Sequence, residues 1–254
     1  KREAFTQEDL TKGRSLASYL ALSVSHGKML REQQNLDHTK RLAEIGQFTA
    51  SIAHEIRNPL TGIRSAAQMV RSNPDLADEF GAIIETEATR LNALCDEFLA
   101  FARPLEIQAS PTSLGELVQR VGSLLKPQFD AARVTLVVSV PAREVTAAVD
   151  EPRIRQVLTN FAINALQASK PGGRVTLCLS EQGHLSVEDD GQGMDPATVR
   201  QLFTPFFTTK PSGTGLGLPM AKKILSAHGA EIQVSAEPNL ASRFEIVFSG
   251  RKAA

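Results

Sequence analysis

The feature that most constrains the fold is a long, regular stripe of mostly apolar residues. Between about residues 8 and 71 the only proline is Pro59, and the composition favours helix throughout. The stripe recurs with alternating steps of three and four: Leu42, Ile45, Thr49, Ile52, Ile56, Pro59, Ile63, Ala66 and Val70. This spacing places them at the a and d positions of a heptad, which are buried in helical bundles. The segment therefore predicts a long helix with one side that must be covered.

The helical region has internal boundaries. An earlier heptad series, Leu22, Met29 and Leu36, does not continue cleanly into the stripe, so either a change of register or a loop lies near residues 35–40. At Ser72-Asn73-Pro74-Asp75 the Asn and Pro end one helix, and Asp75 is expected to cap the next.

The second helix carries its apolar residues on one face and closes at Arg103-Pro104. They are Ala77, Phe80, Ile84, Leu91, Leu94, Phe98 and Phe101. Two amphipathic helices joined by a tight turn form an antiparallel hairpin. A hairpin alone leaves a face uncovered, so we expect a dimer that completes a four-helix bundle.

After Pro104 the pattern changes to alternating strands and helices. We expect helices over residues 114–129, 152–169 and 218–228, and strands over 134–140, 146–150, 174–180, 184–189, 230–236 and 243–248. This order predicts an α/β sandwich separate from the hairpin, with the boundary near residues 103–110.

Composition excludes several classes. Lys plus Arg equals Asp plus Glu at 28 each, so no net positive charge favours nucleic acid. Cys95 and Cys178 have no zinc-type spacing and are expected to be buried thiols. The most apolar early stretch, residues 16–24, is too short to span a bilayer, so no membrane segment is expected. The chain opens without Met, so we expect an excised cytoplasmic part of a longer protein.

One histidine stands out within the stripe. With Ile52 at d and Ile56 at a, His54 falls at f and faces away from the core. An exposed imidazole, largely neutral near pH 7, is a usable nucleophile. The alternative is an exposed histidine without function. At b positions beside it, Arg57, Arg64 and Arg71 form either a solvated basic face or a docking surface for an acidic partner.

Two groups in the second domain could bind a nucleotide. Asn160 and Asn164 lie four apart on one helix, with Gln156 a turn earlier, and amide oxygens suit Mg²⁺ that bridges phosphates. The alternative is a polar surface. Asp189-Asp190-Gly191-Gln192-Gly193 ends a strand and turns sharply. A carboxylate there could accept from an exocyclic amine such as that of adenine, or the segment is a plain turn.

A third group is rich in phenylalanine and glycine. Phe203, Phe206 and Phe207 lead into Thr208-Thr209-Lys210, and Gly213-Thr214-Gly215-Leu216-Gly217-Leu218 then opens a helix. Glycines at a helix N-terminus let backbone N–H groups approach phosphates, and the helix dipole favours negative charge. In isolation the glycine segment is equally typical of a flexible loop.

Together, in this order, these segments resemble the sensor histidine kinases of two-component systems. The H box is at residues 54–60, the N box at 156–165, the G1 box at 189–193, the F box at 203–210 and the G2 box at 213–217. The residues of these motifs are similar to those of the nitrogen-regulation sensors within this family. The resemblance runs from about Lys40 to the end. Residues 1–36 resemble the last helix of a GAF sensor domain.

The resemblance implies three parts. Residues 1–36 are the signalling helix or end of a GAF-like sensor domain, 37–104 the dimerisation and phosphotransfer hairpin, and 105–254 the catalytic domain with a Bergerat ATP-binding fold. It implies a cytoplasmic bacterial, ATP-dependent protein-histidine kinase that uses ATP and Mg²⁺. Its partners are a second copy of itself and the receiver domain of a response regulator, with no nucleic acid.

It also implies roles for residues. His54 takes the phosphoryl group, Glu55 accepts or orients the proton on the other ring nitrogen, and Asn58 orients water in a phosphatase reaction. Asp189 contacts adenine, Asn164 coordinates Mg²⁺ and Asn160 holds the phosphates or the metal shell. The remaining nucleotide-binding positions are Gly191, Gly193, Phe206, Thr209, Lys210, Gly213, Thr214, Gly215, Leu216 and Gly217, of which Lys210, Thr214 and the last glycine segment cradle phosphates.

The chain departs from the family pattern at Pro219 and at Ala230, which follows His228-Gly229 where the family usually has two glycines. Proline is tolerated in a first helical turn, so little consequence is expected. Two competing interpretations are an ATPase of the same fold that drives a conformational change, and a degenerate kinase that acts as a dimeric scaffold. The H box and heptad hairpin argue against the first, and the intact ATP-site motifs argue against the second.

Overall fold

The computed structural model describes residues 52–210, 213–238 and 240–248. The chain divides into two units, Lys1–Ala53 and His54–Ala254, and all described residues except the first two belong to the second. The predictions for residues 1–36, and for a register change or loop near residues 35–40, lie outside the described residues. None of the helices in the described ranges combines the length and apolar character needed to cross a membrane.

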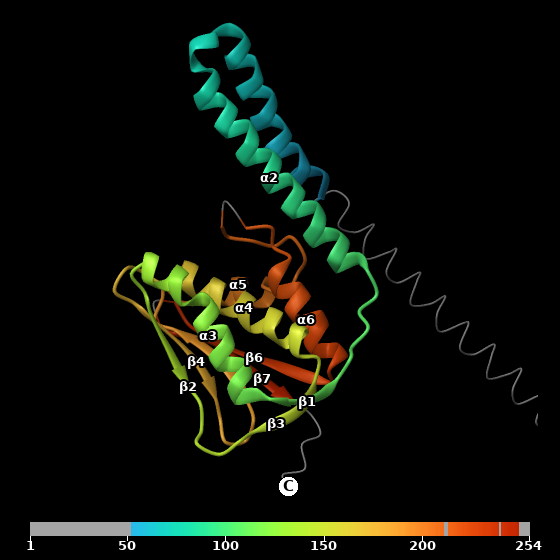
Figure 1. The fold of residues 1–254 in the computed structure, drawn as a ribbon, viewed down its shortest axis with the longest axis vertical. Helices are drawn as coiled ribbons and strands as arrows, with labels where there is room; N and C mark the ends of the chain where they lie inside the picture. Colours follow the sequence, from blue (N-terminus) through green and yellow to red (C-terminus); the bar gives the residue numbers. More distant parts are fainter. Residues whose placement is uncertain (1–51, 211–212, 239, 249–254) are drawn as a thin grey trace, which may run out of the picture. The chain divides into compact units, whose positions relative to one another are not determined.

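The predicted hairpin is present. A helix over residues 52–72 is followed by a 3-10 turn, η1 (Pro74–Leu76), and by helix α2 (Ala77–Ala102), which runs back beside it (Figure 1). The helices pack closely: a Cβ atom built on Gly62 would lie 3.3 Å from Cγ of Glu87. The apolar faces of both helices are turned inward over the described residues, since Ala66 of the first helix and Leu94 of α2 are buried.

The turn between the helices differs in one detail from the prediction. Asp75 lies inside η1 and does not cap α2, whose N-cap position is Leu76 without a side-chain hydrogen bond. The reason is that Asn73 and Pro74 first form a 3-10 turn, in which the N–H of Leu76 donates to Asn73 O at 3.0 Å. The new helix therefore begins two residues after Asp75.

The second part of the chain is an α/β domain with one main sheet. Its elements are β1 (Ser110–Ser113), α3 (Leu114–Ala131), β2 (Thr135–Ser139), β3 (Thr146–Val149), α4 (Glu151–Ala168), β4 (Arg174–Leu179), β5 (Leu185–Asp189), α5 (Pro196–Gln201), α6 (Gly217–Ala227), β6 (Ala230–Ala236) and β7 (Ser242–Phe248). The sheet has the order β2-β4-β5-β7-β6, in which only the β2–β4 pair is parallel. All predicted strands and helices of this domain are confirmed within three residues at each end.

Three helices cover one face of this sheet. Figure 1 shows α3, α4 and α6 lying together over the strands. Strand β4 explains why: alternate residues Val175, Leu177 and Leu179 are buried, whereas Thr176 and Cys178 point the other way and are half-buried. The core forms between the apolar sheet face and the helices, with Phe161 of α4 and Phe244 of β7 in ring contact at 5.0 Å. This packing fixes the position of α4.

Two short elements and the cysteines were not predicted correctly. Strand β1, with the sequence Ser-Pro-Thr-Ser, has no apolar alternation and exists because it pairs with β3. Helix α5 is only six residues long. Cys95 is exposed and Cys178 is half-buried, so the prediction of two buried thiols was wrong. Cys95 follows the buried Leu94 and is turned away from the helix contact, and Cys178 lies on the uncovered face of the sheet.

Candidate functional site

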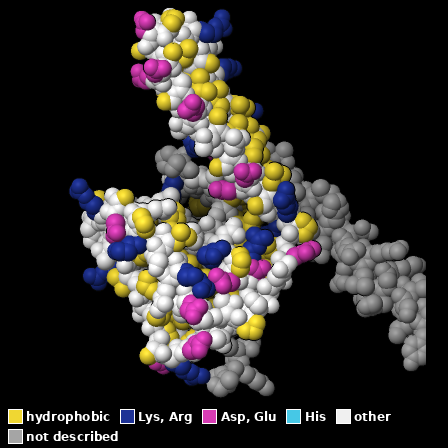
Figure 2. All heavy atoms as spheres, in the orientation of Figure 1, with side chains coloured by type: hydrophobic (Ala, Val, Ile, Leu, Met, Phe, Trp, Pro, Cys, Tyr) yellow, Lys and Arg dark blue, Asp and Glu magenta, His cyan; other side chains and the backbone are white. Residues whose placement is uncertain are grey.

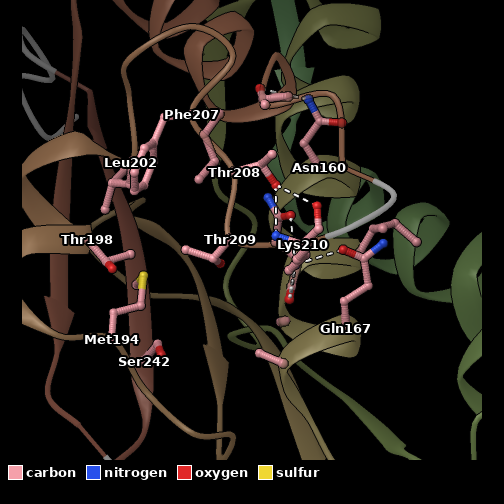
Figure 3. Close-up of a pocket in the computed structure, with 18 of the residues that line it drawn as sticks. Asn160, Gln167, Met194, Thr198, Leu202, Phe207, Thr208, Thr209, Lys210 and Ser242 are labelled. Atoms are coloured by element: carbon pink, nitrogen blue, oxygen red, sulfur yellow. Dashed lines mark hydrogen bonds between the residues drawn. The ribbon is translucent and has the colours of Figure 1, made fainter. Parts of the chain in front are cut away.

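A cavity of about 670 Å³ gathers the motif segments of the α/β domain. The predicted site residues that line it are Asn160, Asn164, Asp189, Gly193, Thr209, Lys210, Gly213, Thr214, Gly215 and Gly217. They come from α4, from the end of β5, from the segment before Gly213 and from the start of α6. Segments far apart in the sequence therefore form one site, which Figure 3 shows from close by.

Helix α4 carries the asparagines, and its start is well specified. Asp150 caps it, with Oδ1 accepting from the N–H of Arg153 at 3.2 Å, and Pro152 lies in the first turn. Asn160 and Asn164 are half-buried and line the cavity. The Nδ2 atom of Asn160 donates to Gly217 O at 3.1 Å, which joins α4 to the first residue of α6.

Asp189 is the last residue of β5, and its side chain is buried, at 5% exposure. Its Oδ1 atom accepts from the N–H of Gly191 at 3.0 Å, and Ser242, which faces it across the β5–β7 pair, also bonds to it. Burial raises the pKa of Asp189 above its usual value, against these hydrogen bonds. The next residue, Asp190, is used differently: its Oδ1 accepts from the N–H of Arg174 at 2.8 Å.

The glycine segment before α6 is fixed by backbone conformation. Gly215 has φ +67°, and a Cβ atom there would lie 2.5 Å from the carbonyl carbon of Phe206. Phe206 itself has φ +64°, an unusual value for a bulky residue, and its N–H donates to Gly215 O at 3.0 Å. Phe206, Leu216 and Gly191 do not line the cavity. They shape it through the backbone, and Leu216 also through a buried side chain.

Lys210 supplies a positive charge at the end of the cavity next to α4. Its Nζ atom donates to Gln167 Oε1 at 2.7 Å, to Asn164 Oδ1 at 3.4 Å and to Asn164 O at 3.5 Å. Thr208 holds the Lys210 backbone, since its Oγ1 accepts from the Lys210 N–H at 3.0 Å. Burial lowers the pKa of the Lys210 ammonium, and the charge of Asp189 opposes this effect.

The opposite wall of the cavity was not predicted from the sequence. Figure 3 shows Met194, Thr198, Leu202 and Ser242 on the side away from Lys210 and Gln167. Most of them lie in or near α5, which Asp195 caps by accepting from the N–H groups of Ala197 and Thr198. The residues in or near α5 lie between the G1 motif and Phe203, and their position between two nucleotide-binding motifs could have identified them as part of the site. The cavity thus has an apolar wall opposite a charged one, which suits a flat aromatic base joined to an anion.

The donor atoms suit a metal that arrives with a phosphate ligand. In the described ranges no three His, Cys, Asp or Glu residues cluster in a way that could hold a metal ion. Amide oxygens are nevertheless hard ligands, and Asn164 Oδ1 already accepts from a cation, the Lys210 ammonium. Mg²⁺ typically takes one or two protein ligands and completes its shell with phosphate and water. Asn164 therefore fits a Mg²⁺–phosphate group.

The residues of the H box do not lie in the cavity. His54 and Asn58 are exposed and Glu55 is half-buried on the helix over residues 52–72. The position of His54 agrees with the f position that the heptad assigns to it. Arg57, Arg64 and Arg71 are exposed as well, as expected for b positions.

Among the described residues of the hairpin, one contributes to the cavity wall. Glu97 of α2 lines it and accepts a hydrogen bond from the hydroxyl of Thr214. Near the end of the same helix, Lys223 of α6 donates to the carbonyl oxygens of Phe101 and Arg103. The sequence offered no signal for these contacts, because Glu97 lies outside every motif.

Two family models match the chain. Residues 44–106 match the His Kinase A (phospho-acceptor) domain, and residues 149–251 match the histidine kinase-, DNA gyrase B-, and HSP90-like ATPase. These matches cover both the hairpin and the domain that holds the cavity.

Curated relatives and solved structures that are similar to this chain are also histidine kinases. The chain is 33% identical over 221 residues to the signal transduction histidine-protein kinase AtoS of Escherichia coli K12, with 85% of this chain and 36% of AtoS covered. It is 34% identical over 227 residues to sporulation kinase C of Bacillus subtilis 168, with 87% and 51% covered. The chain thus spans about a third to a half of the length of these curated relatives.

Among solved structures, histidine kinase ThkA in complex with the response regulator protein TrrA has a TM-score of 0.70 at 27% identity, with 83% of this chain and 64% of that chain covered. Full-length ShkA in complex with AMPPNP has a TM-score of 0.59 at 28% identity, with 78% and 44% covered. The ThkA match spans most of this chain, so the likeness extends beyond the α/β domain alone.

Proposed function

Because this chain belongs to the sensor histidine kinases of two-component systems, we propose that it phosphorylates its own His54 from Mg-ATP and passes the phosphoryl group to an aspartate of a response regulator. One observation carries the proposal: the chain joins an exposed histidine, inside a phospho-acceptor match, to a cavity that gathers the N, G1, F and G2 segments. The AMPPNP complex of ShkA and the regulator complex of ThkA support it.

We propose that ATP lies in the cavity with its base at the apolar wall. The Asp189 carboxylate accepts from the adenine amino group, in a buried place where such a hydrogen bond is strong. Lys210, Thr214 and the backbone N–H groups of residues 213–217 bind the β- and γ-phosphates at the N-terminus of α6. Asn164 holds Mg²⁺ and Asn160 supports the metal shell or the phosphates. Mg²⁺ supplies charge neutralisation on the phosphate oxygens.

The chemical step is an in-line displacement. An imidazole nitrogen of His54 attacks the γ-phosphorus, a P–N bond forms, and the bond from phosphorus to the bridging oxygen breaks to release ADP. Glu55 accepts or orients the proton on the other ring nitrogen. In the second step the regulator carboxylate attacks phosphorus and His54 leaves. Both steps need an accessible imidazole, and the f position gives it one.

We propose that the parts have separate tasks: residues 1–36 transmit a signal, 37–104 dimerise and carry His54, and 105–254 bind ATP. Several large apolar side chains of the hairpin are exposed: Leu60, Met69, Leu76, Ile83 and Leu99. Figure 2 shows apolar side chains along the hairpin. Leu60 and Met69 hold e and g positions, which flank a heptad core. A second copy would cover them and complete a four-helix bundle.

The deciding experiment is incubation of the chain with γ-labelled ATP. We expect label that is stable in base, labile in acid and absent from His54→Gln. A wild-type chain that hydrolyses ATP but acquires no label would instead support an ATPase of the same fold that drives a conformational change. A chain that neither binds nor hydrolyses ATP would be the degenerate scaffold. Either result would overturn the kinase proposal.

A further inference from the structure

One face of α4 presents three amide side chains along the cavity wall. Asn160, Asn164 and Gln167 lie at i, i+4 and i+7, which share a helix face, and all three line the cavity. They differ in their partners. Asn160 bonds to the start of α6, whereas Asn164 and Gln167 both accept from the Lys210 ammonium. Gln167 belongs to none of the roles assigned above.

The two contacts with the ammonium are unequal. Gln167 Oε1 lies at 2.7 Å from Nζ, a short charge-assisted hydrogen bond, whereas the Asn164 side chain is at 3.4 Å and its carbonyl oxygen at 3.5 Å. Figure 3 shows Gln167 and Lys210 turned toward each other, with a dashed line between them. Gln167 is therefore the principal partner of this ammonium among these three acceptors.

The proposed function makes this inequality important. If Asn164 Oδ1 ligates Mg²⁺, that oxygen cannot also hold the ammonium without bringing two positive charges together. Gln167 Oε1 is the side-chain acceptor that stays available to Lys210. Because the Gln167 amide is neutral, it orients the ammonium without cancelling the charge that phosphates need.

We propose that Gln167 is a positioning residue, which acts through Lys210 by holding its ammonium at the phosphate end of the cavity. This inference rests on the proposed function and deepens it. Gln167 has no contact of its own with the nucleotide in this scheme. The contribution of Gln167 to ATP binding must therefore disappear when the ammonium is removed. If Gln167 had a purely structural role, its contribution would remain.

A double-mutant cycle tests this coupling. The variants are Gln167→Leu, Lys210→Met and the pair, and the readouts are the Kd values of ATP and of AMP, each measured with Mg²⁺ present. We expect Gln167→Leu to weaken ATP binding by about threefold to tenfold and to leave AMP binding unchanged. In the Lys210→Met background the same change should have no further effect.

Two more variants sharpen the test. Gln167→Glu should also weaken ATP binding, since a carboxylate pairs with the ammonium and repels phosphate. Gln201→Leu is the matched control: Gln201 is an exposed glutamine of α5 that does not line the cavity, and its replacement should leave the ratio of ATP to AMP affinity unchanged. Gln167 is exposed, so its variants should fold.

The outcomes separate the two proposals. A Gln167→Leu effect of equal size with and without Lys210 would overturn the positioning role, and so would tighter ATP binding, which would mean that Gln167 holds the ammonium away from phosphate. A wild-type chain that binds neither ATP nor AMP would contradict the proposed function itself and this inference with it.

Discussion

The Asp189 carboxylate is held where its charge opposes folding. Burial raises the pKa of Asp189 and lowers that of Lys210, so each group is shifted toward its neutral form. Both groups line the same cavity. Replacing both groups would be expected to raise the free energy of unfolding. Charged groups that are kept at such a cost are typical of a binding site.

Replacing Asp189 should therefore separate stability from binding. The folded-state pKa is above the ordinary value of 3.8, so in the window between them the folded protein binds more protons than the unfolded chain. The free energy of unfolding must fall as pH rises through that window. Because Asn cannot ionise, we expect Asp189→Asn to be at least as stable as wild type at neutral pH, with a flatter pH profile and no ATP binding.

Denaturant unfolding at several pH values, together with an ATP titration, measures both effects. Asp195→Asn is a control of opposite sign, because hydrogen bonds from Thr198 lower the pKa of the exposed Asp195. The stability from Asp195 is present above its ordinary pKa and is lost as pH falls through the folded value. A clear loss of stability at neutral pH in Asp189→Asn would contradict the expectation for Asp189.

We propose that the exposed Asn58 serves a different activity, dephosphorylation of the regulator. It lies one turn after His54 on the same side of the helix, and both are exposed. If its carboxamide orients water against a phosphorylated regulator, Asn58→Ala should retain autophosphorylation and lose regulator dephosphorylation. The rate of loss of label from the purified phosphorylated regulator checks this, and an unchanged rate would refute the role.

At the scale of elements, the junction before α6 depends on a pair of unusual backbone conformations. Gly215 and Phe206 both have positive φ and are joined by one backbone hydrogen bond. In the structure this geometry leads the glycine segment into α6. Position 215 requires glycine for two reasons: its φ is positive, and the Phe206 backbone approaches too closely to leave room for a Cβ atom.

Alanine at two neighbouring glycines should therefore behave differently. Gly215→Ala should lower the free energy of unfolding by about 1 to 3 kcal/mol and weaken ATP binding, because the left-handed conformation is strained and the added Cβ meets the backbone. Gly217→Ala is the control, since its Cβ would meet only the Asn160 side chain at 3.7 Å, an ordinary contact. Equal stability of the two variants in denaturant unfolding would argue against this account.

At the scale of the whole molecule, a basic stripe lies on the helix that carries His54. Arg57, Arg64 and Arg71 are exposed and recur every seven residues. If they attract an acidic regulator, Arg64→Glu should slow phosphotransfer by about tenfold at low salt and reduce its salt dependence, while autophosphorylation stays unchanged.

The measurement is the initial transfer rate to the regulator that accepts phosphate fastest, at several salt concentrations. Lys170→Glu reverses an exposed charge outside the stripe and serves as control. Transfer that keeps its rate and its salt dependence in Arg64→Glu would remove the docking role and leave a solvated basic face.

Local patterns were enough to predict the hairpin and most of the strands and helices of the α/β domain, whereas the segments that meet in the cavity were assigned to one site only through their resemblance to a family. Heptad and alternating periodicities record which side of an element is buried, and glycines record positive φ or close approach, so both can be read along the chain. The exposure of His54 followed from its neighbours Ile52 and Ile56 alone.

Tertiary structure alone decided the rest. Strand β1 exists through its pairing with β3, and Met194, Leu202 and Ser242 form a cavity wall only once β5, β7 and α5 lie together. Gln167 meets Lys210 across 43 residues, and burial shifts the pKa of Asp189 only after the sheet is assembled. Contacts, desolvation and charge pairing depend on distances through space, which periodicity along one chain does not record.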